Sequence, residues 1–375
     1  MSWVTRRVCA DSSRVPYDFM AVKSNLTAVD TLAERLGCEW RNIAEARNRT
    51  AEARWKLDGL AELSAEDTSI IFYGSIGRGE VTESSDADWC VLVDGPSDPG
   101  HASLVANVAD RLASLGFKQP GRTDTFAGLV SSHELVHHIA GTHDTNQNLT
   151  HRMLLLFESV ALTQPLVRGR VIGNVLDRYV TYDVIAPRAE TPKEIVPHFL
   201  LNDVVRYWRT MASDYPAKMW ERRREGWGLR NVKLRFSRKL IFIAGLLACF
   251  SFEWDPPADA SEVRADRERL LPHLRDHIRL HLNQTPLDLL ARAALTSSDD
   301  STSRRVFDAY DQFLGILADP AKRSELESLA IEDTLGSSVW NEAHEASGNF
   351  RNGIQTMFLV NDGHLKDLTL RYGVF

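Results

Sequence analysis

The fold of this chain is decided by two neighbouring stretches, SIIFYGSIGRGE at residues 69–80 and SSDADWCVLV at residues 84–93. The apolar start of the first stretch predicts a buried strand, and Gly74-Ser75 predicts a turn that ends it. A polar loop follows, and residues 86–93 predict a second strand. The pattern therefore predicts two adjacent strands joined by a Gly-Ser turn and a polar loop.

Asp86 and Asp88 fall on one face of the second predicted strand, because side chains alternate between the two faces. Two carboxylates a few ångströms apart repel each other, and a divalent cation between them reverses that effect. Gly74 lacks a Cβ and lets a phosphate approach the backbone, while the Ser75 hydroxyl can donate to a phosphate oxygen. A polar hairpin with two solvated Asp residues does not explain both features. Together they favour in-line transfer of a nucleotidyl group.

These residues resemble the nucleotidyltransferase signature of the polymerase β superfamily: an apolar residue, Gly, Ser or Gly, a variable loop, then Asp-x-Asp. The Gly-Arg-Gly-Glu of the loop and the Ser-Asp-x-Asp end look most like the PII-protein uridylyltransferase and related nucleotidyltransferases. The resemblance covers residues 70–239. It implies an NTP donor, Mg²⁺ (or Mn²⁺) held by Asp86 and Asp88, and nucleotide binding by Gly74 and Ser75, to which the loop adds Arg78.

A third catalytic carboxylate is the open point of this resemblance. The superfamily usually places it on a later strand, which is expected within residues 121–130, where Asp124 is the only acid. Asp124 is therefore the candidate, although a strand-end turn residue explains it as well. Glu134 and Asp144 are substitutes that a loop could bring near.

Residues 206–239 are basic and interleaved with aromatic side chains, although the whole chain carries a formal charge of -7. Three interpretations stay open: a face for a triphosphate, a face for an acidic or nucleic-acid acceptor, or a solvated helix face with aromatic anchors. Lys233 and Ser237 are four residues apart and share one face of the expected helix. In several polymerase β-like enzymes such a Lys and Ser or Thr contact the β- and γ-phosphates, and the resemblance implies this role here.

A group of histidines within residues 133–138 invites a zinc interpretation. No Cys or second His pair stands at a ligand spacing, so solvated or hydrogen-bonded histidines near the active cleft are the favoured interpretation.

Composition bounds the class of protein. A chain of 375 residues with 43% hydrophobic and 25% charged residues is typical of a soluble globular protein with two or three domains. Its net charge of -7 argues against a protein that coats nucleic acid. Four scattered cysteines without CxxC indicate reduced thiols. The N-terminus lacks an apolar signal core, and the apolar run 240–252 is shorter than the roughly 20 residues of a membrane span. These features predict a cytoplasmic protein without a membrane partner.

The predicted fold is α/β followed by all-α. A helical segment (1–66) packs on a small mixed-sheet nucleotidyltransferase domain (67–184), and a C-terminal helical bundle (193–375) follows a proline-containing link at 185–192. The nucleotide is expected in the cleft between sheet and bundle.

The predicted function is metal-dependent transfer of an NMP group from an NTP, such as ATP, to a protein or small-molecule acceptor. Two alternatives stay open. One is an RNA- or nucleotide-directed transferase, including a second-messenger synthase. The other is a nucleotide-binding regulatory protein that has kept the fold and lost the chemistry.

Overall fold

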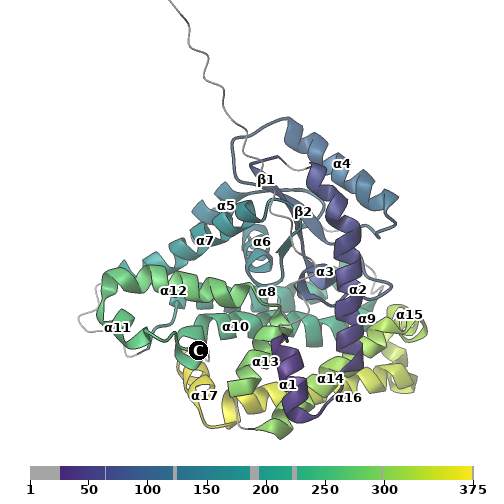
Figure 1. Cartoon of the computed structure of the whole chain (residues 1–375). Coiled ribbons are helices and arrows are strands. Elements are labelled where there is room, and N and C mark those ends of the chain that lie inside the picture. Colours follow the sequence, from purple (N-terminus) through teal and green to yellow (C-terminus); the bar gives the residue numbers. More distant parts are fainter. Residues whose placement is uncertain are drawn as a thin grey trace, which may run out of the picture.

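The structure is a computed structural model that describes residues 26–63, 65–120, 125–185, 194–221, 226–296 and 299–373 (Figure 1). A four-stranded mixed sheet lies in the upper half of Figure 1, with helices around it and a helical lower half. Its strands are β1 (Thr68–Phe72), β2 (Trp89–Val93), β3 (Leu129–Ser131) and β4 (Val160–Ala161). This arrangement confirms the predicted α/β plus all-α fold class.

The sheet has the order β3-β2-β1-β4. β1 pairs antiparallel with β2 and with β4, while β2 pairs parallel with β3. Within the first pair, Ile70 lies opposite Val91. Every residue of β1 and β2 is buried, because helices cover both faces, and this explains why β2 and the last three residues of β1 are apolar without a break.

Two separate apolar clusters cover the two faces. Ile70 and Val91 belong to the cluster that includes α4 (Gly100–Ser114) and the 3₁₀ turn η2 (Asp58–Leu63). Ile71 belongs to the larger cluster that continues into the helical half of the molecule. The helices on that side of the sheet are α5 (Ser132–His137), α6 (Asn146–Phe157) and α7 (Pro165–Ile185).

The predicted turn at Gly74-Ser75 is the first turn of a short helix, α3 (Gly74–Arg78). Gly74 has φ +60°, a value that other residues rarely adopt, and the chain then continues with helical dihedral angles. The second strand begins at Trp89 rather than at Asp86, which forms only an isolated parallel bridge with Lys118. Both differences concern boundaries, and the predicted order of strand, loop and strand is confirmed.

The two N-terminal helices, α1 (Ala28–Leu36) and α2 (Arg41–Leu57), form as predicted, but they do not pack mainly on the sheet. α1 packs on α13 (Pro286–Thr296) and α2 packs on α14 (Asp300–Ala318). The end of α2 reaches the sheet, where Leu57 joins the cluster under β1. An amphipathic pattern predicts that a helix has a buried face and does not identify the partner.

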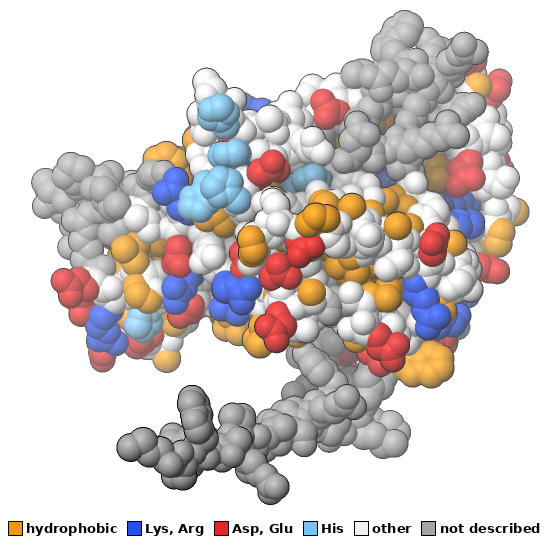
Figure 2. Space-filling view, turned by 90° about the horizontal axis from the view of Figure 1, so that it is seen from above, with side chains coloured by type: hydrophobic (Ala, Val, Ile, Leu, Met, Phe, Trp, Pro, Cys, Tyr) orange, Lys and Arg blue, Asp and Glu red, His pale blue; other side chains and the backbone are white. Residues whose placement is uncertain are grey.

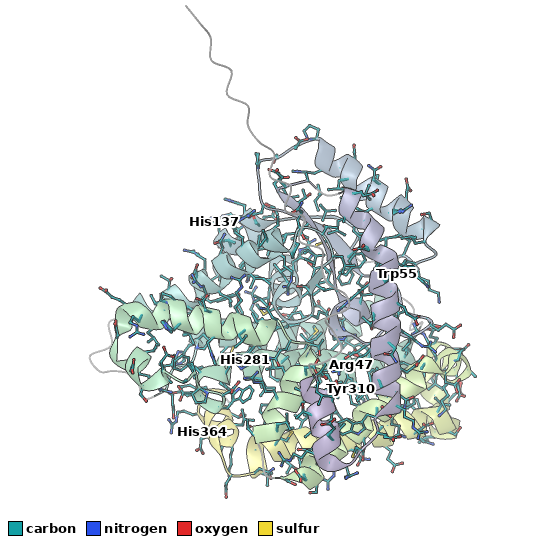
Figure 3. The ribbon with its side chains drawn as sticks, in the orientation of Figure 1. Arg47, Trp55, His137, His281, Tyr310 and His364 are labelled. Carbon is teal, nitrogen blue, oxygen red and sulfur yellow. The ribbon has the colours of Figure 1, made fainter. Side chains whose placement is uncertain are left out.

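Helix α2 connects the helical half to the loop between the first two strands. Arg47, labelled on α2 in Figure 3, forms an ion pair of 2.7 Å with Asp288 of α13. Further along, an Arg54 Nη2 donates to the Ile76 carbonyl of α3 at 2.6 Å. These contacts hold α3 against helices that are distant in the sequence.

The C-terminal half is helical, as predicted. Its buried centre is α10 (Lys239–Trp254), which corresponds to the predicted apolar helix and is apolar on all sides. No helix among the described residues is both long and apolar enough to cross a bilayer. The predicted link lies mostly within residues 186–193, outside the described part.

The remaining helices complete the helical half of the molecule. They are α8 (His198–Glu221), α9 (Trp227–Lys233), α11 (Ala260–Ala265), α12 (Arg267–Leu282), α15 (Pro320–Ser328), α16 (Ser338–Gln355) and α17 (His364–Leu368). The short helical turns are η3 (Leu234–Arg238), η4 (Ile331–Gly336), η5 (Thr356–Val360) and η6 (Thr369–Gly373).

Candidate active site

The junction between β1 and α3 is packed directly against the first carboxylates. The backbone N–H of Tyr73 donates to the Asp88 carbonyl at 2.8 Å. A Cβ at Gly74 would lie 2.7 Å from Asp88 Oδ2, so no larger residue fits without displacing that carboxylate. Ser75 follows in the first turn of α3 and is partly exposed. Gly74 is therefore packed closely against Asp88.

A cavity of about 1010 Å³ lies between the sheet and the helical half. Asp86 and Asp88 line the side of the cavity that is next to the sheet. Residues between Tyr207 and Tyr215 of α8 line a second side. Trp227 to Arg238, from α9 and η3, face the acids, and residues 327–332, at the end of α15 and the start of η4, close the far side. The volume is at the upper end of the roughly 300–1,000 Å³ typical of ligand sites, which leaves room for a nucleotide and a second molecule.

Ionisation of Asp88 is unfavourable in this environment. Burial raises the pKa of Asp88 to about 7, and the charges of Asp86 and Glu158 add to this effect, while Arg238 and Lys233 act against it. A carboxyl group with such a pKa is half protonated at neutral pH unless a cation stabilises its charge. The electrostatics of the pair therefore favour a bound cation.

The positive side of the cavity comes from η3, a π-helical turn between α9 and α10. In a π-helical turn the hydrogen bond joins residues five apart, so Lys233 and Arg238 come onto the same side. Both line the cavity. Burial lowers the pKa of Lys233 to about 8, and the nearby charge of Asp86 acts in the opposite direction. Two cations thus face two carboxylates across the cavity.

Ser237 is placed differently from Lys233. The predicted helix would have put the two on one face, but the wider π turn rotates Ser237 into the core, where it is 4% exposed. It lies beside Tyr310 of α14, which Figure 3 shows in the helical half. The described walls of the cavity include Lys233 and Arg238 but not Ser237. The four-residue spacing used for the prediction holds only in a regular α-helix.

Arg78 is buried behind the acids and does not line the cavity. Its guanidinium pairs with Glu80 at 2.7 Å and also with Glu158, which is 2% exposed. These two negative charges outweigh burial and raise the pKa of Arg78. Arg78 is therefore held inside a structural ion-pair network.

Glu158 connects this network to the cavity. One of its oxygens pairs with Arg78, and the other lies 3.4 Å from an Arg238 Nη1. A Cβ at Gly77 would lie 1.8 Å from the Glu158 carbonyl oxygen, so glycine is required for α3 to approach this closely. Neither Glu158 nor Arg238 was predicted from the sequence to be a site residue. For Glu158, the only signal in the sequence is a single acid at the end of the apolar run of α6.

Glu134 and Asp144, the two described candidates for a third carboxylate, do not line the cavity with Asp86 and Asp88. Asp124 lies outside the described residues. Glu134 is exposed on α5, and Asp144 pairs with Arg152 at 3.0 Å and with Arg206 at 2.8 Å. Among the described residues, no group of three His, Cys, Asp or Glu side chains is arranged to hold a metal ion.

The two acids nevertheless fit a hard divalent cation. Mg²⁺ is commonly held by one or two carboxylates, with water and substrate phosphates supplying the other oxygens. Asp86 and Asp88 provide oxygen ligands and line the same cavity, and the charge of Asp86 opposes ionisation of Asp88. The donor set therefore matches Mg²⁺ or Mn²⁺ bound together with a polyphosphate.

The histidines cluster away from these acids. His133, His137, His138 and His143 form a chain of ring contacts with centroids 4.7 to 5.6 Å apart, and Figure 2 shows histidine side chains gathered on this face. Within the described part of the chain they do not form a metal-binding group.

The comparisons with known proteins agree with the motif. Residues 53–119 match the family model of the nucleotidyltransferase domain, a segment that contains Gly74, Ser75, Asp86 and Asp88. No curated protein and no solved structure gave a significant match. The match supports a nucleotidyltransferase domain in this segment and, in general terms, a function in nucleotidyl transfer. The finer likeness to the PII-protein uridylyltransferase stays a prediction.

Proposed function

We propose that the protein is a metal-dependent transferase that moves an NMP group from an NTP, such as ATP, to a hydroxyl of a protein or small molecule. One observation carries this proposal: two acids and two cations face each other across one cavity that adjoins the Gly-Ser turn. A divalent cation on Asp86 and Asp88, when bound, would neutralise phosphate charge and orient the triphosphate. The cavity volume of about 1010 Å³ supports simultaneous binding of donor and acceptor.

The chain's own residues divide the remaining work. Lys233 and Arg238 are placed to bind the phosphates that become the leaving group, and Glu158 and Arg78 hold Arg238 in position. The acceptor oxygen forms a bond to the α-phosphorus while the bond to the bridging oxygen breaks, and pyrophosphate leaves. The acceptor proton passes to a carboxylate such as Asp88 or to water. Catalysis then rests on positioning and charge neutralisation.

The aromatic wall supports a place for the base. Trp227 lines the cavity, and its other side stacks on Trp340 with ring centroids 4.7 Å apart. An aromatic ring held in this way offers a rigid surface for a nucleobase. A role for Ser75 toward the phosphates remains part of the proposal, whereas Ser237, buried beside Tyr310, would act only by holding the π turn that carries Lys233 and Arg238.

Two alternative functions are compatible with the same site. An RNA- or nucleotide-directed transferase would use the same acids, and Asp124 is the candidate for its third carboxylate. A nucleotide-binding regulatory protein would bind without turnover. Among the described cysteines, Cys38 and Cys90 are thiols outside any disulfide, which supports a reducing compartment such as the cytoplasm.

The test is an incubation with each of four α-³²P-labelled NTPs and Mg²⁺ or Mn²⁺, with and without cell lysate. The Asp86→Asn/Asp88→Asn variant serves as the control. We expect label to enter protein, RNA or a small product with the wild type alone, and the labelled product identifies donor and acceptor. Label transfer at the wild-type rate by the variant would overturn the proposal. Nucleotide binding without any transfer would favour the regulatory protein.

A further inference from the structure

Three cations from three elements gather beside the π turn, outside the walls of the cavity. Arg235 belongs to η3, Lys239 begins α10, and Arg351 lies on α16. An Nη1 of Arg235 lies 3.5 Å from the Ser347 hydroxyl, and Ser347 stands one helical turn before Arg351. Lys239 is one turn beyond Arg235. We call Arg235, Lys239 and Arg351 the basic cluster.

The basic cluster has no acid to neutralise it. Among the described residues, no carboxylate forms an ion pair with any of the three. The Nε–H of Arg235 donates instead to a neutral amide oxygen of Asn231 at 2.6 Å. Burial lowers the pKa of both Arg235 and Lys239, and the charge of Arg351 lowers both further. Arg235 and Lys239 are partly buried and Arg351 is exposed. Like charges this close without a counter-ion destabilise the fold, and a bound anion relieves this cost.

We propose that the basic cluster is a binding site for a small ligand that carries a phosphate group. Arg235 and Lys239 lie one turn apart where η3 runs into α10, and Arg351 lies on the neighbouring helix α16, so the three donors can converge on one multiply charged group. A nucleic acid requires a longer basic stripe, and the chain as a whole carries -7. Arg235 provides a planar fork suited to phosphate oxygens, and Lys239 provides a point charge.

The site adjoins the turn that carries the cavity cations. Arg235 lies on the same π turn as Arg238 and two residues after Lys233. An anion held by Arg235 therefore fixes the turn from its outer side. The proposal does not depend on the proposed transfer reaction, because it concerns binding at residues that do not line the cavity.

The test is titration calorimetry with inorganic pyrophosphate, in EDTA and at constant ionic strength. The proteins are the wild type, Arg351→Gln, Lys239→Gln and Lys233→Gln. The control, Arg305→Gln, removes an exposed arginine of α14. We expect one class of sites to weaken about tenfold or more in Arg351→Gln and Lys239→Gln. Arg305→Gln should bind pyrophosphate at these sites as tightly as the wild type. Lys233→Gln should weaken only the binding of pyrophosphate in the cavity and leave its binding to the basic cluster unchanged. Separate titrations with inorganic phosphate and AMP show whether free phosphate or a phosphate ester is preferred.

Stability separates lost binding from lost structure. Without any anion, Arg351→Gln should be at least as stable toward urea as the wild type, because it removes like-charge repulsion. With pyrophosphate the order should reverse. The proposal is overturned if neither Arg351→Gln nor Lys239→Gln changes the binding isotherm, or if pyrophosphate stabilises them as much as the wild type.

Discussion

Gly74 leaves the space that the Asp88 carboxylate occupies, since a Cβ at residue 74 would lie 2.7 Å from Asp88 Oδ2. The φ of +60° at Gly74 adds a second reason for glycine. The chain after β1 and the chain before β2 can therefore pack closely only because residue 74 has no side chain. This relationship explains why the Gly-Ser pair and the acids occur together.

Gly74→Ala should displace Asp88 and strain the backbone. We expect a loss of about 1–2 kcal/mol in the free energy of unfolding, from the left-handed conformation alone. Transfer activity should fall on the order of a hundredfold, because a small displacement of an aligned group is costly. Urea denaturation and the labelled-NTP assay measure the two effects. Gly348→Ala, where the added Cβ meets nothing within 4 Å, should leave both unchanged or slightly raise stability.

Glu158→Gln should destabilise the protein strongly. The change leaves Arg78 and Arg238 without a shared anion in a site where Glu158 is only 2% exposed. Removing one partner of a buried ion pair typically costs about 3–5 kcal/mol. Denaturation by urea gives the value. Glu45→Gln, which breaks an exposed pair with Arg49, should cost about 0.5 kcal/mol or less. Equal losses in the two variants would contradict a buried network.

The stability of the metal-free protein should fall as pH rises from about 4 to about 7. The pKa of Asp88 is raised to about 7, whereas an Asp in an unfolded chain titrates near 3.9. Between these values the folded state holds more protons than the unfolded state, so the free energy of unfolding decreases with pH. Asp88→Asn removes this contribution. In EDTA, it should therefore be more stable than the wild type at pH 8, by a margin that shrinks by pH 5. An equal difference at both pH values would exclude a raised pKa.

Lys233→Gln and Ser237→Ala should separate the two candidates for the far phosphates. Lys233 lines the cavity, whereas Ser237 is buried beside Tyr310. We expect Lys233→Gln to raise the KM for the NTP about tenfold, the usual scale for one lost charged contact. Ser237→Ala should leave KM within about twofold and act mainly on stability. A larger KM effect for Ser237→Ala would place its hydroxyl on the nucleotide.

The sequence was most informative where a local rule holds. The apolar run before Gly74 identified β1. Alternation predicted that Asp86 and Asp88 share one side of the chain, and both line the cavity although β2 begins only at Trp89. It was least informative where long-range packing decides the outcome. The amphipathic pattern of α1 does not identify α13 as the helix on which it packs. The residues before η3 do not predict a π-helical turn.

The same limit explains the missed site residues. In the sequence, Arg238 is one of many basic residues within 206–239. The π turn η3 is what brings it to the cavity together with Lys233. Glu158 lies far from Arg78 in the sequence, and their pairing follows from the close approach of α3 that Gly77 permits. Such contacts depend on how elements dock, which residue spacing does not encode.

The far wall of the cavity has one further consequence. Residues 327–332 lie opposite acids that occur near the beginning of the described chain, so the matched segment 53–119 supplies only one side of the site. A ligand in the cavity therefore acts as a non-covalent cross-link between distant segments. Because the unfolded chain has no such site, binding is coupled to global folding, and the free energy of unfolding rises with the concentration of the ligand.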